Sequence, residues 1–159
     1  MPVNFDIEPK WEKLKFRNPA IVVDFIYHPK AAWYFDHHLT SFRKPAWKRN
    51  FRQSKYMHWN STYPSCTSFV LDELVRWYGF KPPAQLKELA KWLDITDAGN
   101  FKSAKQTIAF KEPALQLEKF IDRGVGEKKK LIWLIELMSR YPLKKVAAVP
   151  RVRRVMRSI

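Results

Sequence analysis

The chain has 159 residues, enough for one ordinary domain with a hydrophobic core. Hydrophobic residues make up 46% of it, seven of them tryptophan, which is not the composition of a disordered chain. The single cysteine, Cys66, excludes an internal disulfide framework, fits a reducing cytoplasmic compartment and is expected to be a small buried side chain. No secretory signal is found, and no apolar run approaches the ~20 residues that span a membrane, so no membrane partner is expected.

The charge of the chain is strongly positive and unevenly distributed. Thirty Lys and Arg against fifteen Asp and Glu give a formal net charge of +15, which favours polyanionic partners. No acidic residue occurs between residues 37 and 71, and none follows Glu136. Both stretches are rich in Lys and Arg and could contact phosphates, or they could simply form solvated faces that maintain solubility.

Two short apolar stretches near the N-terminus predict strands. Residues 19–25 contain the β-branched run "AIVV", typical of a strand buried on both faces, and residues 31–35 form a second strand, "AAWYF". No hairpin signal joins them, so we expect a parallel pair. The basic, aromatic residues 39–64 are expected to form a long loop.

Helical patterns dominate the rest of the chain. A helix should begin at Ser65 or Thr67, present Val70, Leu74 and Trp77 on one face, and end at Gly79. Further helices are expected at 82–95, 113–123 and 127–141 and in the basic end piece 149–159. The predicted class is α/β, with two short parallel strands and a mostly helical second half. We divide the chain into a lead-in segment (1–20), one domain (21–141) and a basic helical tail or linker (142–159).

Acidic and histidine side chains follow the two predicted strands. Asp24 ends the first strand, and Asp36, His37 and His38 end the second. Open α/β sheets place ligand sites at the carboxyl ends of their strands, and carboxylates with imidazoles suit Mn²⁺, Mg²⁺ or Zn²⁺. The alternative is a pair of turn-capping aspartates beside a chance histidine pair.

Four motifs in order strengthen the metal-site interpretation. They are "IVVDF", "FDHH", "PSCTSFVLDEL" and "DITDAGNF", which together span Ile21 to Phe101. In order and spacing this stretch resembles the DHH phosphoesterase superfamily, whose members hydrolyse phosphate esters of nucleotides, cyclic dinucleotides and single strands, or pyrophosphate. The resemblance implies a parallel-stranded DHH-type domain that uses Mn²⁺ (or Mg²⁺).

The resemblance also implies a role for individual residues. Asp24 would bridge two metal ions, and His37 and Asp97 would be ligands of one of them. Asp36 would orient His37, while His38 would meet the substrate phosphate. Weaker candidates for substrate binding are Arg43, Lys44, Thr67 and Ser68. For Asp94, a residue at a helix end that faces water is the simpler interpretation.

The chain departs from the family pattern in two places. No match to the first family motif, which supplies ligands to both ions, precedes Ile21, and the smaller C-terminal substrate domain is not found. We therefore expect an internal fragment that is inactive alone and whose partners include upstream and C-terminal segments of the same protein. A degenerate relative is the alternative. A missing first strand should leave exposed apolar surface beside residues 21–24.

The expected function is that of a metal-dependent phosphoesterase acting on a nucleotide or a short nucleic-acid phosphodiester, with single-stranded nucleic acid as a partner. One alternative is a non-catalytic, basic nucleic-acid-binding module, whose binding would fall steeply with salt. Another is a structural helical domain in which the Asp-His-His sequence is incidental. The sequence leaves short RNA, single-stranded DNA, cyclic dinucleotides and 3'-phosphonucleotides open as substrates.

Overall fold

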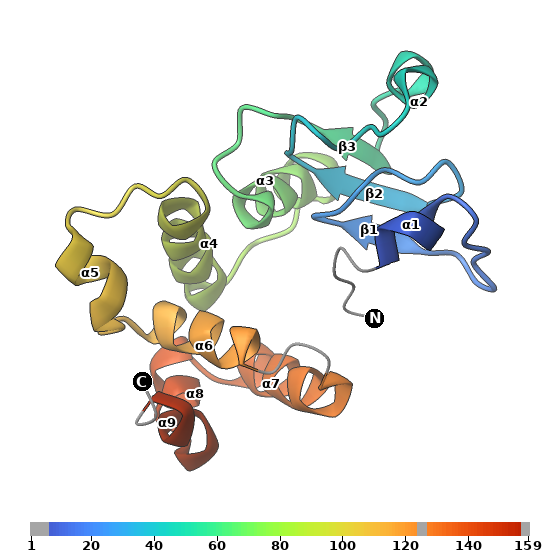
Figure 1. The fold of residues 1–159 in the computed structure, drawn as a ribbon. Helices are drawn as coiled ribbons and strands as arrows, with labels where there is room; N and C mark the ends of the chain where they lie inside the picture. The colour runs from blue at the N-terminus through green and yellow to red at the C-terminus, as the bar shows by residue number, and fades with distance from the viewer. Residues whose placement is uncertain (1–6, 124–126, 157–159) are drawn as a thin grey trace. The chain divides into compact units, whose positions relative to one another are not determined.

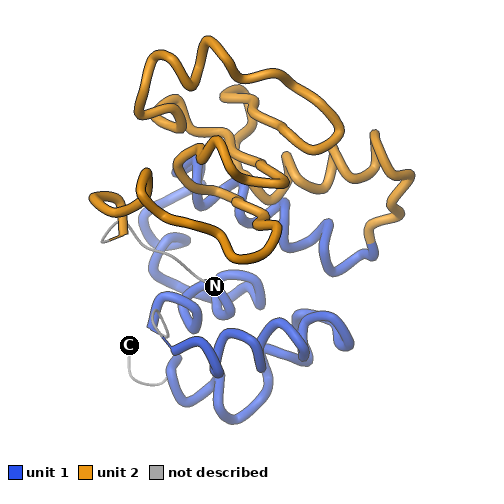
Figure 2. Tube along the Cα trace, turned by 90° about the vertical axis from the view of Figure 1, so that its right-hand side faces the viewer, with its two compact units in different colours: residues 1–3, 83–159 blue, residues 4–82 orange. Residues whose placement is uncertain are grey.

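The computed structural model describes residues 7–123 and 127–156. The chain divides into two compact units, coloured separately in Figure 2. We call Asn4–Pro82 the strand unit, and Pro83–Ile159 together with Met1–Val3 the helical unit. The first six residues of the expected lead-in segment and the last three of the expected tail lie outside the described residues.

A three-stranded parallel sheet forms the centre of the strand unit (Figure 1). Its strands are β1 (Ile21–Val23), β2 (Trp33–Asp36) and β3 (Met57–Trp59), in the order β1-β2-β3. Val22 pairs with Tyr34, and Tyr34 pairs with Met57. The two predicted strands, their parallel pairing and the mixed α/β class are therefore confirmed.

The central strand β2 is buried on both faces of the sheet. Successive strand residues point to opposite faces, and the neighbours Tyr34 and Phe35 are only 0% and 3% exposed. Tyr34 lies in one core cluster with Val22 and with Trp11, which ends the short helix α1 (Glu8–Trp11). On the other face, the ring of Phe35 stacks on His58 of β3, with 4.7 Å between ring centroids. The expected lead-in segment thus contributes to the core.

The prediction that β1 is buried on both faces is wrong. Val22 is buried, but Ile21 and Val23 are 64% and 46% exposed. The helix α3 (Cys66–Tyr78) packs against β2, and within the described residues β1 is an edge strand with β2 as its neighbour. The outer face of β1 therefore carries the exposed apolar surface that we expected beside this strand.

The segment predicted as a long loop contains a helix and a strand. Residues 39–64 include α2 (Pro45–Asn50), whose Trp47 packs with Phe51 against the core, and β3. The outer edge of β3 is satisfied by a side chain: Gln53 accepts a hydrogen bond from the Trp59 N–H (3.2 Å) and donates one to the Trp59 carbonyl. The strand β3 has only three residues, and one of its edges is paired with the side chain of Gln53. It is therefore too short to show the alternation of apolar and polar residues that predicts a strand.

The ends of α3 agree with the sequence prediction. The hydroxyl of Ser65 accepts a hydrogen bond from the Ser68 N–H (3.2 Å) and caps the helix. Gly79 ends it in the left-handed conformation, with φ of 63°. Cys66, the first helical residue, is buried as expected and lies 3.5 Å from the Phe35 carbonyl.

The buried face of α3 differs from the predicted one. Cys66, Phe69 and Glu73 face the sheet, whereas Trp77 is 47% exposed. The reason is a polar contact with the sheet: His58 Nδ1 lies 2.6 Å from the Glu73 carboxylate, which also accepts a hydrogen bond from Trp77 Nε1. An apolar pattern could not identify this face, since a carboxylate occupies its centre.

The described residues of the helical unit form six helices and no strand. They are α4 (Ala84–Asp97), α5 (Ala104–Ala109), α6 (Pro113–Asp122), α7 (Lys128–Arg140), α8 (Leu143–Ala147) and α9 (Pro150–Met156). The predicted helices correspond to α4, α6, α7 and α9, while the short α5 and α8 were not predicted. In the described part of the chain, no helix is long and apolar enough to cross a membrane.

The segment expected to be a tail or linker packs into this unit. Leu143, Val146 and Val152 are at most 1% exposed and share a core cluster with Leu117 and Phe120 of α6. The Lys and Arg side chains of α8 and α9 are exposed. Residues 143–156 therefore have two faces, one completing the core and one presenting positive charge.

Candidate metal centre

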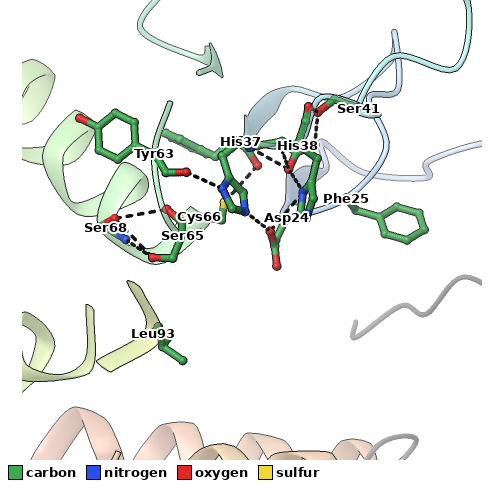
Figure 3. A network of polar contacts seen from close by, with 12 residues as sticks. Asp24, Phe25, His37, His38, Ser41, Tyr63, Ser65, Cys66, Ser68 and Leu93 are labelled. Atoms are coloured by element: carbon green, nitrogen blue, oxygen red, sulfur yellow. Dashed lines mark hydrogen bonds and ion pairs between the residues drawn. The ribbon is translucent and has the colours of Figure 1, made fainter. Parts of the chain in front are cut away.

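Three potential metal ligands meet at the carboxyl ends of β1 and β2. Asp24 directly follows β1, and His37 and His38 directly follow β2. Because the strands are parallel and adjacent, both ends lie at one edge of the sheet. Each of the three residues offers one ligand atom, and these atoms lie within 4.8 Å of one another. Figure 3 shows the three side chains facing each other.

Asp24 sits at the middle of this group in an unusual backbone conformation. Its Oδ1 atom lies 3.6 Å from His37 Nε2 and 3.7 Å from His38 Nδ1. Its φ of 55° is in the left-handed region, which few non-glycine residues adopt and which Asp tolerates better than most. The Asp24 N–H donates to the Phe35 carbonyl (2.9 Å), so the sheet holds this conformation.

The electrostatics of Asp24 reflect both its burial and its neighbours. Partial burial raises the pKa of the Asp24 carboxyl, and the nearby Asp36 carboxylate raises it further. The imidazoles of His38 and His37 act in the opposite direction. A cation at this point would favour the ionised form of Asp24, as a metal ligand requires.

The ring of His37 is oriented by a backbone carbonyl. His37 Nδ1 lies 2.9 Å from the carbonyl oxygen of Tyr63, in the connection between β3 and α3 (Figure 3). A carbonyl can only accept, so Nδ1 carries a proton, and in the neutral imidazole the lone pair of Nε2 points toward Asp24. Metal-binding histidines are commonly fixed in this way.

Asp36 orients the second histidine. Its Oδ1 atom lies 2.7 Å from His38 Nδ1, whereas His37 receives only a backbone contact, from its N–H to Asp36 Oδ1 (2.9 Å). The resemblance implied that Asp36 would orient the ring of His37, and the structure differs. The physical reason is that His37 Nδ1 is already hydrogen-bonded to the Tyr63 carbonyl, so this ring atom is not available to the Asp36 carboxylate.

Asp36 itself belongs to a buried hydrogen-bond network. It is 1% exposed, and its Oδ2 atom accepts hydrogen bonds from the hydroxyls of Tyr34 (2.9 Å) and Ser41. Trp59 Nε1 in turn donates to Ser41 Oγ (3.1 Å) and to the His38 carbonyl (2.9 Å). Burial, then the Asp36 carboxylate, raises the pKa of Tyr34, so its hydroxyl remains a donor.

Two of the candidate substrate-binding cations are paired with acids. Arg43 lies 2.7 Å from Glu8, and Lys44 lies 2.6 Å from Glu12. Glu8 is the first residue of α1, and Glu12 directly follows this helix. Part of the positive charge in the acid-free residues 37–71 is therefore neutralised by acidic side chains from the N-terminal part of the chain.

The other candidates lie on two different helices. Thr67 and Ser68 are in the first turn of α3, where the Ser68 hydroxyl lies 3.3 Å from the Ser65 carbonyl. Asp97 is the last residue of α4, in the helical unit, and Asp94 lies one turn before it. The participation of Asp97 in the metal centre stays a prediction.

Sequence reasoning named Asp36 as a supporting residue but missed the other residues that support the ligands. Tyr34 and Asp36 are two residues apart on a strand and therefore share a face, a signal that could have linked them. No such signal marks Ser41, Tyr63 or Trp59. Tyr63 acts through its backbone carbonyl, and the contacts of Ser41 and Trp59 form only in the folded chain.

Comparison of the chain with protein-family models, with curated proteins and with solved structures found no match.

Proposed function

We propose that this chain is a metal-dependent phosphoesterase of the DHH type, acting on a phosphodiester of a nucleotide or a short nucleic acid. The observation that supports this most is the convergence of Asp24, His37 and His38 within 4.8 Å at the edge of a parallel sheet. The order of the four sequence motifs supports it independently.

The residues present fit a divalent cation. A carboxylate oxygen of Asp24 and an imidazole nitrogen of His37 form a donor pair suited to Mn²⁺ or Zn²⁺, and less to Mg²⁺, which prefers oxygen ligands. In its neutral form, His37 presents the lone pair of Nε2 to the site. When bound, such an ion supplies charge stabilisation to phosphoryl oxygens and makes a water more acidic.

The side chains around the site would hold the cation and contact the substrate phosphate. Asp24 and His37 would hold the cation, with Tyr63 fixing the His37 tautomer. His38 is half exposed, and Asp36 fixes its ring, so it is placed to donate a hydrogen bond or a proton to a phosphate oxygen. The buried network around Asp36 limits the movement of this ring, which favours catalysis by positioning.

A hydrolysis assay tests the proposal. The chain, at high protein concentration, is mixed with bis(p-nitrophenyl) phosphate and Mn²⁺. We expect at most weak turnover, because Asp24 and His37 can hold one ion, whereas a two-ion clamp is stronger. EDTA, Asp24→Asn and His37→Gln should each abolish it. Asp122→Asn, an exposed aspartate of α6, is the matched control and should leave it unchanged. Turnover that survives both EDTA and Asp24→Asn would refute the proposal.

A second candidate function is metal-independent binding of single-stranded nucleic acid. It is favoured by cations that lie over aromatic rings: Lys48 is 5.2 Å from the ring centroid of Trp59, and Lys55 is 4.9 Å from that of Tyr56. Such pairs combine phosphate attraction with stacking surfaces, as single-strand binders do. Trp59 also contacts the His38 carbonyl, so this surface adjoins the metal centre. Binding that persists in EDTA would separate this function from hydrolysis.

A further inference from the structure

A cavity in the helical unit shares no lining residue with the metal centre. It has a volume of about 780 Å³ and is lined by residues of α4, of the start of α6, and of α8 and α9. This size is within the range of pockets that hold small ligands. Nothing in the proposed phosphoesterase function uses it.

Three cations from different parts of this unit border the cavity. Lys111 precedes α6, Lys144 is in α8 and Arg153 is in α9. All three are exposed, and among the described residues none of their side chains has a hydrogen bond or an ion pair. These three cations outnumber the two carboxylates that line the same cavity, Glu88 and Glu112, and a bound anion would balance the remaining positive charge. An arginine fork beside two lysines suits the oxygens of a phosphate.

Acceptor groups border the same cavity. The carboxylates of Glu88 and Glu112 line it, and within the described residues neither lies within 4.0 Å of a cation. Gln116 donates its amide N–H to the Phe110 carbonyl (2.9 Å), which leaves its amide oxygen as an acceptor. A simple anion would not use these acceptors, whereas hydroxyl groups on a ligand could donate to them.

The cavity also has an apolar wall. Pro113, Ala147 and Met156 contribute to its lining and could contact the face of a sugar or of a planar ring. The surrounding unit is strongly basic, with seventeen Lys and Arg against eight Asp and Glu in residues 83–159. Such a field attracts anionic small molecules to the site.

We propose that this cavity binds a phosphorylated small molecule that carries hydroxyl groups, a sugar phosphate or a mononucleotide, with Lys111, Lys144 and Arg153 holding its phosphate. The site is separate from the proposed metal centre in residues and in chemistry. Its occupancy therefore needs no divalent ion.

Calorimetric titration of the full chain tests this proposal, in low salt and with EDTA. The probes are AMP, ribose 5-phosphate, inorganic phosphate and adenosine. We expect AMP and ribose 5-phosphate to bind at least several-fold more tightly than inorganic phosphate, because only they offer donors to Glu88, Glu112 and Gln116. Adenosine should not bind, since it lacks the phosphate. Equal affinity for inorganic phosphate and ribose 5-phosphate would overturn the assignment of a hydroxyl-bearing ligand.

Charge-matched variants locate the site. The triple variant Lys111→Gln, Lys144→Gln, Arg153→Gln should bind AMP at least ~10-fold more weakly, the loss expected for charge-assisted hydrogen bonds. The control variant Lys91→Gln, Lys105→Gln, Arg140→Gln removes the same charge from exposed positions of this unit and should change affinity less than ~2-fold. All six side chains are exposed, and thermal melting checks that both variants fold.

The outcomes separate this proposal from the proposed function. Asp24→Asn should leave AMP binding in EDTA unchanged, whatever it does to hydrolysis. Absence of binding by any phosphorylated probe would overturn the cavity proposal. An equal loss in both triple variants would also overturn it, because the attraction would then come from general charge.

Discussion

Asp24 combines a functional side chain with a backbone conformation that most residues avoid. Its φ of 55° places it in the left-handed region, where Asn and Gly are tolerated far better than Ala. Strain of this kind is found where the surrounding structure fixes a residue for a purpose. Here the Asp24 N–H is bonded to Phe35, and the carboxylate is turned toward two histidines.

Because of this strain, we expect the usual order of stability, in which an Ala variant is more stable than a Gly variant, to be inverted at position 24. Asp24→Gly should be more stable than Asp24→Ala by about 1 kcal/mol, since only glycine adopts this φ without a steric cost. Asp24→Asn should be close to the wild type in stability. Urea unfolding measures all three variants. At Asp94, inside α4, the order should reverse, with Ala more stable than Gly. The same order at both positions would contradict the strained conformation.

Ser41 is a second residue whose contribution can be measured. It is 1% exposed, donates to Asp36 and accepts from Trp59 Nε1 (3.1 Å). Ser41→Ala would leave buried partners unsatisfied, at a cost of about 1–3 kcal/mol in the free energy of unfolding. Ser139→Ala, an exposed serine on α7, is the control and should change stability by less than ~0.5 kcal/mol. Indistinguishable urea midpoints for the two variants would argue against the network.

At the scale of elements, acidic residues in and just after α1 neutralise the cations that precede α2 but not those within it. Glu8 and Glu12 pair with Arg43 and Lys44, whereas Lys48 and Arg49, exposed on α2, have no acidic partner among the described residues. If this surface binds nucleic acid, the second pair should contact phosphates and the first pair much less.

The salt dependence of binding distinguishes the two pairs. For a single-stranded oligothymidine, Lys48→Gln with Arg49→Gln should reduce the slope of log K against log salt by ~1.4, or ~0.7 per lost contact. Arg43→Gln with Lys44→Gln should reduce it by less than half as much, because these cations are already neutralised. Fluorescence anisotropy at several salt concentrations measures both slopes. Equal reductions would show that the ion pairs with Glu8 and Glu12 do not persist in solution.

The sequence could predict those elements whose signals are local. The apolar runs ending at Asp24 and Asp36 specified β1 and β2, and the serine and glycine at the ends of α3 specified its boundaries. The strand β3 could not be predicted, because its edge is completed by Gln53 rather than by a strand. The buried face of α3 was misjudged because Glu73 is paired with His58, which no periodicity reveals.

For the candidate site too, only the features with local sequence signals could be predicted. Asp24, His37 and His38 could be placed together because parallel strands bring their carboxyl ends to one edge. The orientation of each imidazole could not, since it depends on the Tyr63 carbonyl and on which histidine Asp36 reaches. The contribution of Asp97 depends on the helical unit and stays a prediction.

At the scale of the whole molecule, stability should depend on pH through a buried histidine. His28 is 2% exposed and lies between the rings of Trp11 and Phe16. Burial, and then the charge of Lys30, lowers the pKa of His28 below its usual 6.5. The unfolded chain therefore binds this proton more readily than the folded one.

The sign of the effect follows from this difference in proton binding. The contribution of neutral His28 is fully present above pH 6.5 and is lost as the pH falls, with a slope of at most about 1.4 kcal/mol per pH unit. His28→Phe removes the titrating group, so its unfolding free energy should fall less between pH 7 and pH 5 than that of the wild type. Chemical unfolding across this range measures the difference. Parallel pH profiles would exclude His28 as the cause.

The central claim is that Asp24 and His37 hold a divalent cation beside His38. Electron paramagnetic resonance of added Mn²⁺ measures it directly, because free and bound ions give different signal amplitudes. We predict one bound Mn²⁺ per wild-type chain, affinity at least ~10-fold weaker in Asp24→Asn, and wild-type affinity in Asp122→Asn. A chain that binds no Mn²⁺, or that binds it equally well with Asn at position 24, would contradict the claim.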